Sequence, residues 1–317
     1  MKRKVLCIIL SIILSTLALT TGVAAAAEYR VAYVARAQAD SFAAWLANSL
    51  RAEAEKYDDI TLTVFDSQAN EERGNTLIEN AITNKFDAII VQAHNGEAQK
   101  PYIAKIVEAG IVCITTNPRV EVPGASTVDA DPYEQAAVNA RVAVNQIPQD
   151  AKVVVLTGPP GNMHSTERRK AWQAEFFDKR PDVQIVAEDI ANWNKDEAMA
   201  LMEDWVIAHG VVQGIISMND NMCAGALEVL VGKPEFDGIF SYGVDGTAEA
   251  LLLIRDGRMT STGLQSAIDI AELNLDIVNK LLTGEGTEFH VDVPAPLINK
   301  DNVQELIDVY ISRGLIE

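Results

Sequence analysis

The sequence is poor in cysteine and in positive charge, and it lacks the common catalytic motifs. Three cysteines among 317 residues are too few for a disulfide framework. Lys and Arg number 26 against 45 Asp and Glu, a net charge of −19 that repels phosphate backbones and argues against nucleic-acid binding. No G-x-S-x-G, H-E-x-x-H, C-x-x-C or P-loop pattern occurs, so no reaction class is indicated. Apolar residues make up 48% and charged residues 22%, which excludes a disordered tail or a collagen-like fibre.

The first 27 residues have the order of a secretory signal peptide. A basic start, 2–4, precedes an apolar run, 5–19, and then a run of alanines, 24–27, which predicts cleavage near Ala27. The alternative is a membrane anchor, but the run is shorter than the roughly 20 residues that a span needs. Cys7 lies inside the run, so we do not expect a lipid-modified cysteine. We expect an exported, periplasmic protein.

Removal of this segment leaves 290 residues and, because the segment carries three cations and no anion, a net charge of −22. No later segment has 18 consecutive apolar residues, so we expect the remainder to be soluble. Cys113 falls in an apolar strand pattern and Cys223 in a helical one. Both are expected to be buried small hydrophobic residues rather than a disulfide pair or a nucleophile.

Short apolar runs alternate with amphipathic helical patterns along the chain, which predicts βαβ units and an α/β fold with parallel sheets. The runs are nearly continuous in apolar residues, as in strands covered on both faces. They are Tyr29–Ala35, Ile60–Phe65, Ala88–Gln92, Val112–Thr115, Val153–Thr157, Val183–Val186, Gly214–Met218, Ile239–Val244 and Met259–Leu264.

The alternation breaks once, near residues 129–150. A short strand, 126–128, is followed there by a long helical pattern over 133–146, and a second series of strands begins at Val153. We interpret this as two doubly wound parallel-sheet lobes. No Gly/Ser-rich linker separates them, so ordered crossings are expected.

Ligands of open α/β sheets bind outside the carboxyl ends of the strands, so the residues after each run are candidate site residues. They are rich in Asn, Gln, Asp and Arg, with two aromatic residues, Phe42 and Trp193. Amide, carboxylate and guanidinium groups suit the hydroxyls of a sugar, and aromatic rings suit its C–H faces. The alternative for any single Asn or Asp is a helix cap or a turn.

Cofactor and metal sites are not indicated. The first strand lacks the glycines that a dinucleotide needs after it, and no metal-ligand spacing joins the four histidines. His209 and His290 are expected to be structural, whereas His94 and His164 follow strands and are placed to reach a ligand.

Four patches in order give the chain a resemblance to the periplasmic sugar-binding proteins of ABC importers, in the ribose and galactose/glucose-binding class. The patches are Phe65-Asp66-Ser67-Gln68-Ala69-Asn70, Ala191-Asn192-Trp193-Asn194, Asn219-Asp220-Asn221-Met222 and Gly243-Val244-Asp245-Gly246. The resemblance spans the chain after residue 27. It implies two lobes joined by a three-segment hinge, with crossings near Ala130, Gln265 and Asp292. The lobes would be 28–130 plus 266–292, and 131–265 plus 293–317.

The resemblance also assigns ligand-binding roles by position. Asp40 resembles a residue that binds sugar hydroxyls, and Phe42 and Trp193 resemble the rings on the two sugar faces. Arg168 resembles the arginine contributed by the second lobe. The remaining matches are amide and carboxylate positions: Gln92, Asn219, Asp245 and Gln265.

Some positions depart from the family pattern. Asn117-Pro118 replaces the Asp-Arg pair of the ribose type, and Ala43 replaces a second aromatic residue. Asn162 and His164 stand where the galactose/glucose type has His and Asp. No calcium loop is present. A hexose, a pentose and a cyclic polyol such as inositol therefore all remain open as ligands.

The resemblance implies a monomeric carrier, not an enzyme, that delivers its ligand to an ABC transporter permease. A ligand-binding module for a chemoreceptor or a sensor kinase is the first alternative. A sugar-responsive repressor would need a DNA-binding domain where the signal peptide stands, and a secreted enzyme would need a nucleophile–base pair or a metal pattern.

Overall fold

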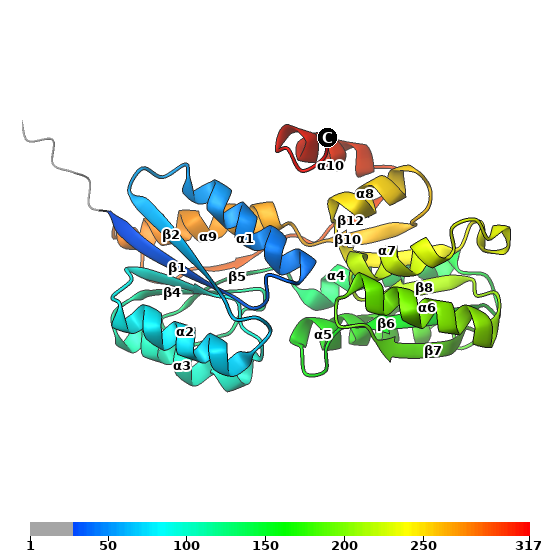
Figure 1. Ribbon diagram of the computed structural model, residues 1–317, viewed down its shortest axis with the longest axis horizontal. Coiled ribbons are helices and arrows are strands. Elements are labelled where there is room, and N and C mark those ends of the chain that lie inside the picture. The colour runs from blue at the N-terminus through cyan, green and yellow to red at the C-terminus, as the bar shows by residue number, and fades with distance from the viewer. Residues whose placement is uncertain (1–27) are drawn as a thin grey trace, which may run out of the picture.

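The structure, a computed structural model, describes residues 28–317, so the expected signal peptide lies outside the described residues. The chain forms two lobes side by side, each a six-stranded sheet between helices (Figure 1). The first sheet has the order β11-β5-β4-β3-β1-β2 and the second the order β12-β10-β9-β8-β6-β7. The predicted α/β fold with two doubly wound lobes is confirmed.

All strand pairs of the first sheet are parallel. Its strands are β1 (Tyr29–Ala35), β2 (Ile60–Asp66), β3 (Ala88–Val91), β4 (Val112–Thr116), β5 (Ser126–Asp129) and β11 (His290–Asp292). Alternate residues of β1 enter two separate cores. Val31 and Tyr33 pack under α1 (Ser41–Ala54) and α9 (Ala267–Leu282). Ala32 and Val34 pack against α2 (Glu71–Thr83) and α3 (Gly96–Glu108).

The second sheet is parallel except for its edge strand β12, which runs antiparallel to β10. Its strands are β6 (Lys152–Thr157), β7 (Gln184–Ile190), β8 (Gly214–Ser217), β9 (Phe240–Asp245), β10 (Ser261–Leu264) and β12 (Leu297–Asn299). β7 runs four residues beyond the predicted end at Val186. The added part of the strand contains polar residues, which the criterion of an apolar run leaves out. One of them is Glu188, whose Oε1 accepts a hydrogen bond from Arg169 Nε at 2.8 Å.

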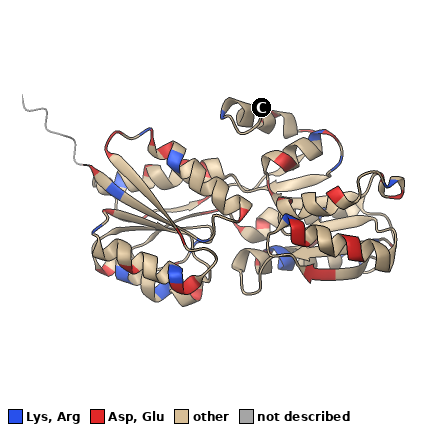
Figure 2. Ribbon diagram, in the orientation of Figure 1, with Lys and Arg blue, Asp and Glu red and all other residues tan. Residues whose placement is uncertain are grey.

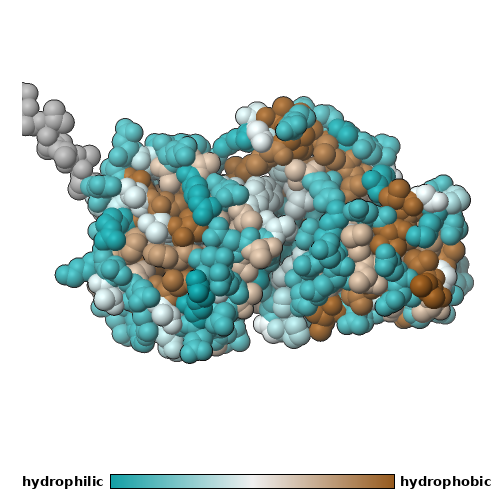
Figure 3. Space-filling view, viewed as in Figure 1, coloured by the Kyte–Doolittle hydropathy of each residue, from teal (hydrophilic) through white to brown (hydrophobic). Residues whose placement is uncertain are grey.

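Helix α4 (Pro132–Gln146) packs on α5 (Met163–Trp172), which continues into a π-helical turn (Gln173–Phe177). Helix α6 (Lys195–His209) packs on α7 (Asp220–Val229). A short 3-10 turn (Pro234–Phe236) precedes β9. The last helix, α10 (Val303–Ser312), packs on α8 (Ala248–Arg255), and brown apolar residues mark its outer face (Figure 3).

Three segments carry the chain between the two sheets. The first follows β5 at Asp129, the second follows β10 at Leu264, and the third joins β11 to β12. The C-terminal helix adds a further contact between the lobes. The rings of Trp45 on α1 and Tyr310 on α10 meet edge to face, with centroids 5.6 Å apart.

Cys113 and Cys223 are both free and buried, as predicted. Within residues 28–317, no helix combines the length and the apolar character needed to cross a bilayer. Acidic residues are spread over both lobes (Figure 2), and hydrophilic residues cover much of the visible surface (Figure 3).

Candidate ligand-binding site

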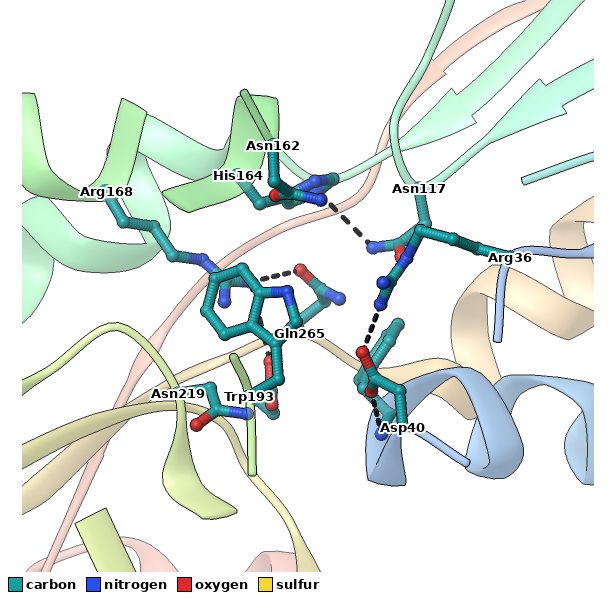
Figure 4. A pocket seen from close by; sticks show the side chains of 11 residues that line it. Arg36, Asp40, Asn117, Asn162, His164, Arg168, Trp193, Asn219 and Gln265 are labelled. Atoms are coloured by element: carbon teal, nitrogen blue, oxygen red, sulfur yellow. Dashed lines mark hydrogen bonds and ion pairs between the residues drawn. The ribbon is translucent and has the colours of Figure 1, made fainter. Parts of the chain in front are cut away.

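A cavity lies between the lobes, where loops after the carboxyl ends of both sheets meet (Figure 4). It encloses about 320 Å³ of space free of protein atoms, part of it open to solvent. The lining residues are Arg36, Asp40, Phe42, Asn117, Asn162, His164, Arg168, Trp193, Asn219, Asp245 and Gln265. The ligand-binding candidates predicted from the sequence are all among them except Gln92 and His94, and Arg36, which follows β1, lines the cavity as well.

On the first lobe, Asp40 is held by the helix that it begins. Its Oδ1 accepts from the backbone N–H groups of Phe42, at 2.9 Å, and Ala43, at 3.3 Å, so the carboxylate caps α1. Its Oδ2 accepts from the Arg36 guanidinium. The ring of Phe42 is 5% exposed and packs edge to face on Trp45. The first lobe therefore presents an ion pair beside an aromatic ring.

On the second lobe, Arg168 is a buried cation with a fixed orientation. Its Nε and Nη2 donate to Gln135 Oε1 at 2.9 and 2.6 Å, and its Nη1 donates to the Met218 carbonyl at 2.7 Å. Its Nη2 also donates to Gln265 Oε1 at 2.7 Å and lies 3.4 Å from Asp245 Oδ1. A guanidinium held at every nitrogen keeps one geometry toward the cavity.

Asp245 offers an unused acceptor. Its Oδ2 is buried and has no hydrogen-bond partner, whereas its Oδ1 faces Arg168. Burial raises the pKa of Asp245, Arg168 opposes the rise, and the nearby Asp220 adds to it. A ligand hydroxyl that donates to Oδ2 would satisfy this atom, which otherwise carries the cost of an unpaired buried polar group.

The indole of Trp193 lies directly against the backbone of Gly158. A Cβ at residue 158 would come within 2.2–2.4 Å of ring atoms, so only glycine leaves room for this indole. Trp193 has a φ of +63°, and Asn221 Nδ2 donates to its carbonyl at 2.8 Å. The Arg168 guanidinium carbon lies 5.6 Å from the ring centre, within cation–π range. Several independent contacts therefore hold the ring at the cavity.

Asn162 and Asn219 both cap helices and line the cavity. Asn162 Oδ1 accepts from the Ser165 N–H at 3.2 Å, and Asn219 Oδ1 accepts from the Met222 N–H at 2.9 Å. Since each oxygen is bound to a backbone donor, each Nδ2 is left to donate elsewhere. The two readings of a strand-end Asn, helix cap or ligand contact, are thus compatible at these positions.

Gln92 does not reach the cavity, because its side chain turns back into the first lobe. Its Oε1 accepts from Tyr33 Oη and from the Arg36 N–H, each at 3.0 Å, and its Nε2 donates to Asn117 Oδ1 at 2.8 Å. Asn117 Nδ2 in turn lies 3.3 Å from His164 Nε2 on the opposite lobe. Gln92 therefore supports a lining residue and does not itself line the cavity.

Comparisons with known proteins agree with this arrangement. A family model described as periplasmic binding protein domain matches residues 31–286, most of the chain. The chain belongs to the periplasmic binding protein family. A "Xylitol-binding protein" of Mycolicibacterium smegmatis is 28% identical over 250 residues, which cover 76% of this chain and 70% of that protein.

Solved structures resemble this periplasmic binding protein over nearly their whole length. The Caulobacter myo-inositol binding protein bound to myo-inositol matches with a TM-score of 0.80 and 25% identity, covering 88% of this chain and 97% of that one. An ABC transporter solute binding protein from Bacillus halodurans with bound myo-inositol matches with a TM-score of 0.81 and 20% identity, covering 90% and 99%. The second likeness shows the fold alone.

One residue that supports the site of this periplasmic binding protein cannot be found from the strand ends, and another is found there without its partner. Arg36 directly follows β1 and so belongs to the strand-end candidates, but the sequence does not reveal its pairing with Asp40. Gln135 lies inside α4, where no strand-end or cap signal marks it, yet its Oε1 holds Arg168.

The other histidines lie elsewhere in this periplasmic binding protein. His94 follows β3 but is not among the lining residues, and burial lowers its pKa to about 4. His209 ends α6 and His290 begins β11. Within residues 28–317, no group of three or more His, Cys, Asp or Glu side chains is placed to hold a metal ion.

Proposed function

We propose that this protein captures one uncharged monosaccharide or cyclic polyol between its lobes and delivers it to an ABC importer. The observation that carries the proposal is the lining of the cavity. Amide, carboxylate and guanidinium groups from both lobes surround the cavity together with the rings of Phe42 and Trp193. Such a lining matches vicinal hydroxyls and apolar C–H faces.

The charges of the lining favour an uncharged ligand. Arg36 pairs with Asp40 on the first lobe, and Arg168 faces Asp245 on the second. Each cation therefore has its own carboxylate, and neither lobe presents an excess of one sign to a ligand. A uronate or an amino sugar would add a charge without a free counter-charge in the lining.

Contact with both lobes would let the ligand favour the closed arrangement selectively, which is the physical basis of capture. We divide the lobes as 28–130 plus 266–292 and 131–265 plus 293–317. Supporting this division, β11 joins the first sheet whereas β12 and α10 pack with the second lobe. Residues 1–27 would direct export to the periplasm, where the family acts.

The relatives support the polyol side of the proposal. One relative is called a xylitol-binding protein, and the Caulobacter structure contains bound myo-inositol. Both are uncharged and carry a hydroxyl on every carbon. We therefore extend the proposal to acyclic polyols, and rank polyols of both kinds with pentoses and hexoses as candidate ligands of the site formed by Asp40, Arg168, Asn219 and Asp245.

A thermal-shift panel of pentoses, hexoses, inositols and xylitol tests the proposal. We expect a saturable rise in the melting temperature with one of these compounds and no chemical change of that compound on prolonged incubation. A matched panel of uronates and amino sugars should give no shift. If no neutral member raises the midpoint, the proposal is wrong; if a product accumulates, the protein is an enzyme instead.

A further inference from the structure

We propose that Gln92 is a positioning residue that orients the Asn117 amide, so that Asn117 donates a hydrogen bond across the cleft to a neutral His164. The inference deepens the proposed function, on which its effect on ligand affinity rests. Gln92 is 1% exposed and does not line the cavity. Its influence on the ligand would pass entirely through the two residues beyond it.

The orientation of the Gln92 amide is fixed by a group that only donates. The Arg36 backbone N–H lies 3.0 Å from one end of this amide, which must therefore be the oxygen, Oε1. The Tyr33 hydroxyl, 3.0 Å from the same atom, can donate to it as well. The opposite end of Gln92, toward Asn117, is consequently the NH₂ group.

The Gln92 amide in turn fixes the orientation of the Asn117 amide. Gln92 Nε2 lies 2.8 Å from Asn117, so the Asn117 atom that it meets is the acceptor Oδ1. The other end of Asn117, Nδ2, then faces His164 Nε2 at 3.3 Å. Since Nδ2 only donates, Nε2 must accept, and a neutral His164 carries its proton on Nδ1.

This bond joins the lobes, because Asn117 follows β4 in the first sheet and His164 belongs to α5 of the second lobe. The charged groups facing His164 are Asp129, whose Oδ1 lies 3.8 Å from Nε2, together with Arg168 and Arg36. The single carboxylate favours a protonated ring, whereas burial, the two cations and the Asn117 amide oppose it.

The first test measures the His164 tautomer directly. Nitrogen-15 spectra of the histidine rings in the ligand-free protein distinguish a protonated ring nitrogen from an unprotonated one, and His164→Gln assigns the signals. We expect Nε2 unprotonated and Nδ1 protonated at neutral pH. Asn117→Asp should reverse this, because a carboxylate oxygen would then face Nε2. A wild-type Nε2 that carries the proton, or that shows mixed tautomers, overturns the proposal.

The second test compares two buried glutamines of the same lobe. Gln92→Met removes the orienting bonds. Gln99 offers a matched control: it is also 1% exposed, its Oε1 accepts from the His94 N–H at 2.6 Å, and its Nε2 donates to Asn75 at 3.0 Å, outside the cavity lining. Both variants should lose stability. Only Gln92→Met should produce a mixture of His164 tautomers. Only this variant should also raise the dissociation constant of the ligand by about three- to tenfold, the effect of losing one net hydrogen bond.

The outcomes separate this proposal from the proposed function. If no sugar or polyol binds the wild type, the proposed function fails, but the tautomer spectra still decide the role of Gln92. If Gln92→Met leaves the tautomer unchanged, the positioning role is refuted. It is also refuted if Gln99→Met lowers the affinity for the ligand as much as Gln92→Met does.

Discussion

The contact between Gly158 and Trp193 allows the binding site to be tested without touching any lining residue. Gly158→Ala would place a Cβ 2.2 Å from Trp193 Cζ2 and 2.4 Å from two further ring atoms. Carbon atoms in contact normally lie about 3.5–4.0 Å apart, so the indole has to move by about 1.3 Å or more. Gly158 does not adopt a positive φ, so the new side chain adds no backbone strain of its own.

A displaced indole loses its contact with the ligand. Removing a buried aromatic anchor costs about 1–3 kcal/mol of binding free energy, which corresponds to about 5- to 150-fold in the dissociation constant. Calorimetric titration with the ligand found in the panel measures this loss. Gly232→Ala is the control: its φ of +79° makes alanine strained, but no atom lies within 4 Å of the new Cβ. It should lower stability and leave affinity unchanged.

A double-mutant cycle tests whether Gly158→Ala acts through Trp193. Trp193→Ala should itself weaken binding by about 1–3 kcal/mol. In that background, Gly158→Ala should have no further effect, because the ring with which its Cβ collides is gone. If the two changes are additive, Gly158→Ala acts through something other than Trp193.

Three further predictions concern pH and stability. Burial raises the pKa of Asp220 to about 7. Its contribution to stability is therefore full below the unfolded pKa of about 3.9 and is lost as the pH rises through about 7, so the melting temperature should fall over this range. Asp220→Asn should make this fall less steep, and an unchanged slope would contradict the prediction. Burial lowers the pKa of His164 below its ordinary value of about 6.5, so the ring is neutral at that pH and ligand affinity should drop only at a more acidic pH. His164→Gln should abolish this dependence, and a drop that survives the substitution belongs to another group. Tyr310→Phe removes the bond of 2.8 Å to the Gly246 carbonyl and should cost about 1–2 kcal/mol of unfolding free energy in urea titrations, whereas no loss would mean that α10 is held by packing alone.

Strand positions and strand-end residues were predictable because each depends on local pattern. Continuous apolar runs such as Val31–Ala35 mark strands buried on both faces, and parallel strands bring their carboxyl ends to one edge. That is enough to place Asp40 at one edge of the first sheet and Asn162 with Asn219 at one edge of the second. It also explains why helix caps appear there, since each helix begins just after a strand.

The direction of individual side chains was not predictable in the same way. Gln92 follows β3 as the pattern requires, yet hydrogen bonds to Tyr33 and the Arg36 N–H turn it away from the cavity. Gln135 holds Arg168 from the middle of a helix, a contact between elements far apart in sequence. Such partners depend on tertiary packing and rotamers, which no local spacing encodes.

Capture of one neutral polyol or sugar between the lobes is tested most directly by isothermal titration calorimetry with inositols, xylitol, pentoses and hexoses. We expect at least one of these compounds to bind at one saturable site per chain, with an affinity that Trp193→Ala and Asp245→Asn each lower. Absence of binding by every member of the series, or binding that neither substitution changes, would contradict it.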